Sequence, residues 1–144
     1  MKLEFSAGGI VFKESEGTLY ILLAQHSQHH GWGFPKGIIG DHKKGEGREE
    51  TALREVEEET GAIGKILHPL SAVSFEYQWG DEKRKKTVYY YVMRYRKGDI
   101  THHDFEMEKV EWILAENVNK KLTYQADKDT WNEAEKYIRE IETI

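Results

Sequence analysis

The sequence predicts one mixed α/β (α+β) domain in which two helices pack against a β-sheet. Several short segments rich in β-branched and aromatic residues are separated by Gly, Pro and charged residues, as strands are. Residues 47–60 and 127–143 instead carry apolar residues at helical spacing. The chain has 144 residues, of which 38% are hydrophobic and 33% charged, which is enough for a sizeable core. We therefore expect residues 1–144 to form a single domain.

The first two expected strands are residues 3–13 and 18–24. Gly8 and Gly9 lie within the first strand, which indicates a bulge or a close approach of another backbone segment. The second strand is an almost continuous apolar run, which is typical of a strand buried on both faces. We therefore expect residues 18–24 near the centre of the sheet.

Two loops and a stiff segment are expected next. Residues 25–33 are polar, and residues 38–46 are rich in Gly and Lys, so both are interpreted as loops. Between them, Pro35 fixes its own φ and pushes Phe34 toward extended geometry. The segment 34–37 is therefore expected to be constrained.

The helix expected over residues 47–60 ends before Gly61, a residue suited to the left-handed conformation at a helix C-terminus. Four residues at helical spacing predict the side that faces the core. These residues are Ala52, Leu53, Val56 and Thr60.

Three carboxylates lie beside this apolar face. Glu55, Glu58 and Glu59 are spaced i, i+3, i+4, so on a helix they share one face. Crowded carboxylates repel one another, and oxygen ligands of this kind suit hard divalent cations. The cluster therefore predicts a site for Mg²⁺, with Mn²⁺ as an alternative, although spacing alone also fits an ordinary solvated face.

The second half of the chain is expected to be rich in strands. Residues 63–79 are mostly β-structure, and residues 73–79 alternate so that every second side chain points to the same side. A charged turn over residues 80–86 joins them to an aromatic strand at 87–96, which makes a hairpin. A short strand is expected at residues 109–114, before the amphipathic C-terminal helix.

Composition limits the functions that are open. No apolar run approaches 18 residues, which excludes a transmembrane helix, and the N-terminus lacks the pattern of a secretory signal. The absence of Cys excludes disulfides and agrees with the cytoplasmic location that we expect. The net charge is −5 and the basic cluster at residues 83–86 is short, so duplex nucleic acid is not an expected partner.

Residues 40–62 resemble the Nudix box, a pattern with seven fixed positions. These positions are filled here by Gly40, Glu46, Arg54, Glu55, Glu58, Glu59 and Gly61. The order of the expected strands and helices is also similar to that of the Nudix fold. The resemblance implies an α/β/α sandwich with a mixed, curved sheet between helices. It also implies Mg²⁺-dependent hydrolysis of a phosphoanhydride bond in a nucleoside diphosphate linked to another group.

One feature departs from the family pattern. In many family members the glycine of a Pro-Lys-Gly segment is the first glycine of the box, but here Gly37 lies three residues before Gly40. The chain therefore resembles a family member with a three-residue insertion before Glu46. We favour Gly37 over Gly40 as the source of a backbone metal ligand, because the segment before Gly37 is stiff.

Two further segments resemble the hydrolases of dinucleoside polyphosphates such as diadenosine tetraphosphate. One is residues 32–37, Trp-Gly-Phe-Pro-Lys-Gly, and the other is Leu-Thr-Tyr at residues 122–124, followed by Asp127. That group usually has His directly after Pro-Lys-Gly, whereas this chain has Ile38. A nucleotide polyphosphate is therefore the expected partner, with a dinucleoside polyphosphate favoured.

The resemblance implies that Glu55, Glu58 and Glu59 hold the metal. It also implies a general base, which is Glu55 in some members and a later Glu in others. Glu106 stands where the later Glu is often found, and its alternative interpretation is a solvated loop acid. Arg54 is interpreted either as holding a box carboxylate or as an i, i+4 partner of Glu58. The catalytic candidates are Arg54, Glu55, Glu58 and Glu106.

Candidate substrate contacts lie outside the box. Lys36 is expected to contact a phosphate, whereas the cluster Lys83–Lys86 and the pair His29 and His30 are interpreted as solvated. A nucleobase needs an aromatic surface, and Tyr90 and Tyr124 are our candidates for it.

Two rival functions stay open. One is hydrolysis of nucleoside triphosphates, 5′-triphosphorylated RNA or another nucleoside diphosphate linked to a different group. The other is a non-catalytic binding module of the same fold, which the intact acids of the box argue against.

Overall fold

The computed structural model describes residues 1–40 and 43–143 of the chain. Within these residues the strands form one eight-stranded mixed sheet. Its central strand, β1 (Lys2–Ser15), pairs in parallel with β7 (Glu82–Gly98) and antiparallel with β2 (Thr18–His26). Asp41 and His42, in the loop predicted over residues 38–46, lie outside the described residues.

Five shorter strands complete the sheet. β3 (Trp32–Gly33) and β8 (Met107–Leu114) pair with β2, while β5 (Ala62–Pro69) and β6 (Val73–Trp79) pair with β7. β4 (Lys36–Ile38) pairs antiparallel with β1. The long strands β1 and β7 therefore connect the two halves of the sheet.

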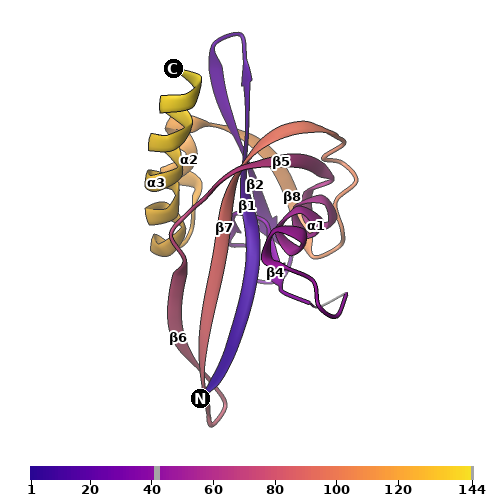
Figure 1. The fold of residues 1–144 in the computed structure, drawn as a ribbon, viewed down its shortest axis with the longest axis vertical. Helices are drawn as coiled ribbons and strands as arrows, with labels where there is room; N and C mark the ends of the chain where they lie inside the picture. The colour runs from indigo at the N-terminus through magenta and orange to yellow at the C-terminus, as the bar shows by residue number, and fades with distance from the viewer. Residues whose placement is uncertain (41–42, 144) are drawn as a thin grey trace.

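The described helices lie on both sides of the sheet, and Figure 1 shows α1 and α3 on opposite sides of the strands. α1 (Arg48–Thr60) covers a small core that includes Val11, Val56 and Met93. α2 (Val118–Lys121) and α3 (Gln125–Glu142) cover a larger core on the other face, and a 3₁₀ turn (Ala115–Asn117) leads into α2. The expected α/β/α sandwich is confirmed. No described helix combines the length and apolar character needed to cross a membrane.

Most long elements agree with the sequence prediction. β2 is buried on both faces, since Ile21 and Leu23 belong to the larger core and Leu22 to the smaller one. Gly61 ends α1 in the left-handed conformation, at φ +80°. The predicted buried face of α1 was partly wrong, because Leu53 is 37% exposed. The other three predicted residues are buried, and the buried face extends to Glu55 and Glu59 on the carboxylate side instead of to Leu53.

Three local predictions need correction. The segments interpreted as loops contain β3 and the last residue of β4, and the rest of β4 lies in the segment 34–37 that was expected to be constrained. The charged turn predicted over residues 80–86 is mostly strand, because Trp79 already pairs with Glu82 across a two-residue turn that starts at Gly80 with φ +61°. At Gly8 the close backbone approach is correct, since a Cβ there would overlap the carbonyl oxygen of Pro35. The alternative of a bulge is wrong, since β1 pairs with β7 without a register shift.

Candidate active site

The three carboxylates of α1 come together where the helix faces β4. Glu55 and Glu59 are buried, and Glu58 is half-buried at the edge of the same face. Gly37 of β4 lies directly against Glu55, because a Cβ at Gly37 would overlap the Glu55 carboxylate. The helix and the strand are therefore closer here than any side chain at residue 37 would allow.

Arg54 connects three acidic members of the box. Its Nε and Nη2 donate to the two carboxylate oxygens of Glu46, at 2.7 and 2.8 Å. Its Nη1 donates to Glu55 at 2.8 Å and to Glu58 at 3.1 Å. The arginine thus makes both contacts considered from the sequence. Thr51 Oγ1 also donates to Glu46 at 2.6 Å, and the bonds from Arg54 hold the pKa of Glu46 down at about 2.

Glu59 carries the unfavourable charge of this cluster. Its Oε1 accepts the backbone N–H of Lys36 at 3.3 Å. Burial raises the pKa of Glu59 to about 8, the negative charges of Glu55 and Asp104 add to the rise, and the Lys36 ammonium opposes it. The charged form of Glu59 is therefore unfavourable in the folded chain, chiefly because the carboxylate is buried.

The donor set fits a hard divalent cation. Three carboxylates on one helix face, packed against a glycine whose missing side chain lets the Glu55 carboxylate come close to β4, are oxygen ligands of the kind that Mg²⁺ or Mn²⁺ prefers. Across residues 1–40 and 43–143, however, no three His, Cys, Asp or Glu side chains are already arranged around a common point. In this arrangement Arg54 Nη1 contacts both Glu55 and Glu58 instead.

The acid cluster lines an open cleft of about 920 Å³. Its opposite wall is formed by the segment between β7 and β8, residues 102–106, which is attached to α1 where Asp104 N–H donates to the Glu58 carbonyl at 3.0 Å. Asp104 also adds to the rise in the pKa of Glu59. Asp104 was not predicted from the sequence, because no periodicity or motif in this loop marks it.

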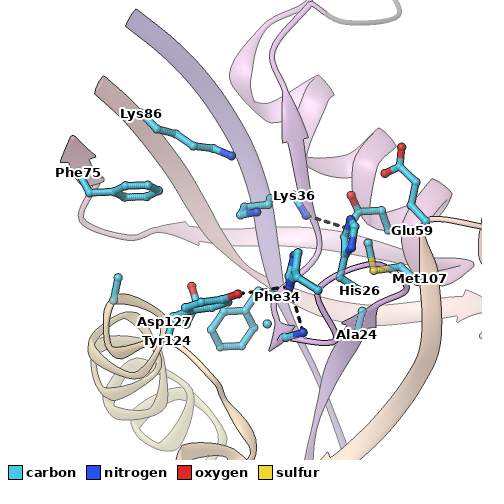
Figure 2. A pocket seen from close by; sticks show the side chains of 15 residues that line it. Ala24, His26, Phe34, Lys36, Glu59, Phe75, Lys86, Met107, Tyr124 and Asp127 are labelled. Carbon is cyan, nitrogen blue, oxygen red and sulfur yellow. Dashed lines mark hydrogen bonds between the residues drawn. The ribbon is translucent and has the colours of Figure 1, made fainter. Parts of the chain in front are cut away.

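A second cavity, of about 550 Å³, opens beside the cleft (Figure 2). The two hollows share three lining residues, Lys36, Glu59 and Glu106. The cavity also has exposed aromatic walls from Phe75 and Tyr124. An acid-lined cleft and an aromatic cavity therefore meet at Lys36.

The structure places the predicted catalytic and phosphate-contacting residues together. Lys36, Glu55, Glu58, Arg54 and Glu106 all line the cleft, and Gly37 lines it as well. Glu106 is exposed at the junction of cleft and cavity, and its backbone is held by bonds to Ser27 and Asp104. Gly40, unlike Gly37, contacts Glu46. Its backbone bonds to the Glu46 carboxylate and helps to lower the pKa of that group.

The two tyrosines proposed for the base have different environments. Tyr124 is 48% exposed and lines the cavity. Tyr90 is only 2% exposed, because β7 directs it into the core, where its ring packs edge-on against Phe34 at 5.8 Å. The prediction that the Tyr90 ring offers a surface to a base is wrong. Its hydroxyl instead bonds to Asp127, which does line the cavity.

Further cavity residues were interpreted as solvated or were missed. Lys86 lines the cavity, and burial lowers the pKa of its ammonium group. His26 and His29 also line it and stack face to face, with ring centroids 4.2 Å apart. Phe75 was assigned to a strand, but nothing in the alternation of β6 indicated which face would meet a cavity.

The sandwich fold and the glutamate-rich helix against β4 are those of a NUDIX domain. The model of this domain matches residues 2–135, and the chain belongs to the NUDIX family. A Mycobacterium tuberculosis protein that carries the name of a mutator protein, MutT4, is 30% identical over 97% of this chain, and the match covers 58% of that relative's length. Rat bis(5′-nucleosyl)-tetraphosphatase (asymmetrical) is 29% identical over 90% of this chain and 87% of its own length.

A solved structure supports the same fold. The NUDIX domain of Shewanella oneidensis NrtR, complexed with ADP ribose, is similar with a TM-score of 0.75 at 21% identity. The match covers 96% of this chain and 90% of the NrtR chain.

Proposed function

We propose that residues 1–144 form one Mg²⁺-dependent NUDIX hydrolase domain that cleaves a phosphoanhydride bond in a nucleoside diphosphate linked to another group. The favoured substrate class is a dinucleoside polyphosphate such as diadenosine tetraphosphate. The observation that carries the proposal is the meeting of the acid-lined cleft and the aromatic cavity at Lys36. A phosphate chain that leaves a base in the cavity would pass Lys36 on its way to the carboxylates.

Each residue has a defined task in this proposal. Glu55, Glu58 and Glu59, with the Gly37 carbonyl, would hold the metal. When bound, the metal neutralises phosphate oxygens and lowers the pKa of a coordinated water. Arg54 orients Glu55 and Glu58, while Lys36 binds a phosphate oxygen.

The general base is either Glu55 or Glu106. Glu55 is buried beside Gly37, whereas Glu106 is exposed where the two hollows join. As general base, Glu55 would act next to the other box acids, whereas Glu106 would act from the segment between β7 and β8 that lines the cleft.

The comparisons also support a rival substrate class. The match to rat bis(5′-nucleosyl)-tetraphosphatase covers most of both chains and favours a dinucleoside polyphosphate. The NrtR domain was solved with ADP ribose, and Ile38 replaces the usual His at the edge of the acid cleft. Nucleoside triphosphates, 5′-triphosphorylated RNA and other linked diphosphates are therefore the alternatives. A binding module would not need the complete set of box acids.

A substrate panel with Mg²⁺ tests the proposal. Diadenosine tetraphosphate, ATP, RNA with a 5′-triphosphorylated adenosine and ADP ribose, which all carry adenine, are incubated with the chain, and the products are resolved by chromatography. We expect the tetraphosphate to be cleaved fastest, and Glu58→Gln to lower kcat at least 100-fold. Glu50→Gln, an exposed change on the same helix, is the matched control. Unchanged hydrolysis in Glu58→Gln would refute the metal assignment, and cleavage of only another panel member would refute the substrate class.

A further inference from the structure

One polar group in the aromatic cavity has no part in the chemistry proposed above. Asp127, in the first turn of α3, lines the cavity together with Tyr124 and Gly33. The buried hydroxyl of Tyr90 donates to its carboxylate. Asp127 Oδ2 lies 3.0 Å from the position that a Cβ on Gly33 would take. The carboxylate is therefore held from the core side, and a glycine leaves room for it at the cavity wall.

The cavity surrounds this carboxylate with surfaces that suit any base. Phe75 and Tyr124 are 45% and 48% exposed and line the same cavity. Stacking on such rings is favourable for every nucleobase, because every base has a π-face. The rings therefore supply affinity with little selectivity, and selection among bases falls to the polar groups of the cavity.

A carboxylate can only accept hydrogen bonds, and it accepts best from two parallel N–H groups. Guanine presents N1–H and N2–H side by side on one edge. Hypoxanthine keeps N1–H but lacks the amino group, and adenine has an acceptor at N1 beside its amino group. Uracil has one N–H between two carbonyl oxygens, which a carboxylate repels. Among these edges, guanine complements a fixed carboxylate best.

We propose that Asp127, positioned by Tyr90, selects the base of the nucleotide and favours guanine. This inference rests on the proposed function and deepens it, because the bond that is cleaved stays the same while guanosine substrates are preferred over adenosine ones. Asp127 touches the base, and Tyr90 acts through Asp127. The buried tyrosine thus takes part in base recognition through its hydroxyl.

Equilibrium binding of GMP, IMP, AMP and UMP, measured by calorimetry with EDTA present, tests this inference apart from catalysis. We expect GMP to bind the wild-type chain about tenfold or more tightly than IMP, since the two differ only in the 2-amino group. Asp127→Asn removes one acceptor oxygen, so GMP affinity should fall about tenfold and the GMP-to-IMP ratio should drop below three. Tyr90→Phe keeps the carboxylate and the ring packing, and we expect an intermediate ratio.

Asp129→Asn is the matched control, because Asp129 lies on the same helix, is exposed, and bonds to Gln125 at a distance of 3.0 Å. This variant should keep the wild-type ratio. Equal binding of GMP and IMP to the wild-type chain overturns the inference, as does a wild-type ratio in a folded Asp127→Asn or the absence of any monophosphate binding. If Asp127→Asn does not fold, a wild-type GMP-to-IMP ratio in Tyr90→Phe overturns the inference instead.

The two proposals fail in different ways. Cleavage of a dinucleoside polyphosphate without selective GMP binding refutes only the role of Asp127. Selective GMP binding that depends on Asp127, without cleavage of any polyphosphate, refutes the proposed activity and leaves the base site standing.

Discussion

Single residues shape this site both by the room that they leave for neighbouring atoms and by their charges. Gly37 contributes by lacking a side chain, because the Glu55 carboxylate fills the place of its Cβ. Arg54 contributes by joining Glu46, Glu55 and Glu58 in one set of hydrogen bonds. At this scale the site depends on contacts that a one-atom change can disturb.

Gly37→Ala should displace the Glu55 carboxylate, because the new Cβ would overlap it. We expect kcat to fall at least tenfold and the stabilisation by Mg²⁺ in thermal unfolding to shrink. Gly47→Ala is the control, since Gly47 has φ −80° and its Cβ would meet its nearest neighbour, Glu50, at 4.0 Å. If the two variants are equally active, the close contact at Gly37 has no catalytic consequence.

Glu46→Gln should destabilise the fold in a pH-dependent way. The folded-state pKa of Glu46, about 2, lies below its ordinary value of 4.5, so its charged form stabilises the folded chain. This contribution is present above pH 4.5 and is lost as the pH falls toward 2. We expect a cost of about 2–3 kcal/mol in urea unfolding at pH 7 that shrinks at pH 3. A cost that is independent of pH would contradict the lowered pKa. Glu50→Gln, an exposed change, should cost less than about 0.5 kcal/mol at either pH.

At the scale of elements, α1 is held in place at its end. Gly61 closes the helix in a left-handed conformation against the segment that follows β7, and Asp104 bonds back to the Glu58 carbonyl. The same segment forms the far wall of the acid cleft. The end of the helix therefore positions both walls of the cleft.

Gly61→Ala tests this junction. The left-handed conformation costs a side chain about 1 kcal/mol, and the new Cβ would also overlap the Asp99 carbonyl oxygen. We expect a loss of about 3 kcal/mol or more in denaturant unfolding. Gly80→Ala is the control, because Gly80 has φ +61° and no atom within 4 Å of its added Cβ. It should cost only about 1 kcal/mol. Equal costs would show that the overlap at Gly61 is relieved without penalty.

The sequence predicted elements that have a long pattern and missed those that do not. The periodicity of α1 and its glycine stop were sufficient for the helix, and an apolar run was sufficient for β2. β3 and β4 have two and three residues, too few for any period to be visible. The alternation of β7 places Tyr90 on one face of the strand but does not indicate whether that face points into the core. Asp104 and His29 enter the site from loops, whose path depends on tertiary contacts.

The folding stability of the whole molecule is lowered by a group that the proposed metal site requires. Burial brings Glu59 into the cleft at a cost in stability, because its pKa of about 8 lies above the ordinary carboxylate value. Since the folded-state pKa is raised, the cost appears above pH 4.5 and grows as the pH rises toward 8. A bound divalent cation would offset this cost by favouring the charged form.

Glu59→Gln should therefore stabilise the metal-free chain while removing activity. In EDTA at pH 8 we expect the variant to be more stable than wild type by about 2–4 kcal/mol, with a smaller difference at pH 5. Mg²⁺ should raise the melting temperature of wild type and have little effect on the variant. Thermal unfolding with and without Mg²⁺ measures both effects. A variant less stable than wild type at pH 8 would contradict the unfavourable burial of Glu59.

The three-residue strand β4 has a consequence for how this chain tolerates changes in length. Lys36 lines both hollows, and Gly37 packs against Glu55. Successive residues of a strand point to opposite faces of the sheet, so a one-residue shift of β4 would move both residues to the wrong face. Just beyond β4, Ile39 N–H donates to the Phe5 carbonyl at 2.9 Å, and further along the chain Glu46 bonds to Arg54 and Thr51. Because the closure cost of a flexible loop rises slowly with its length, added residues after β4 cost little as long as both anchors hold. A peptide tag inserted between these two anchors should therefore leave both hollows intact, whereas an insertion between Gly33 and Lys36 would displace β4.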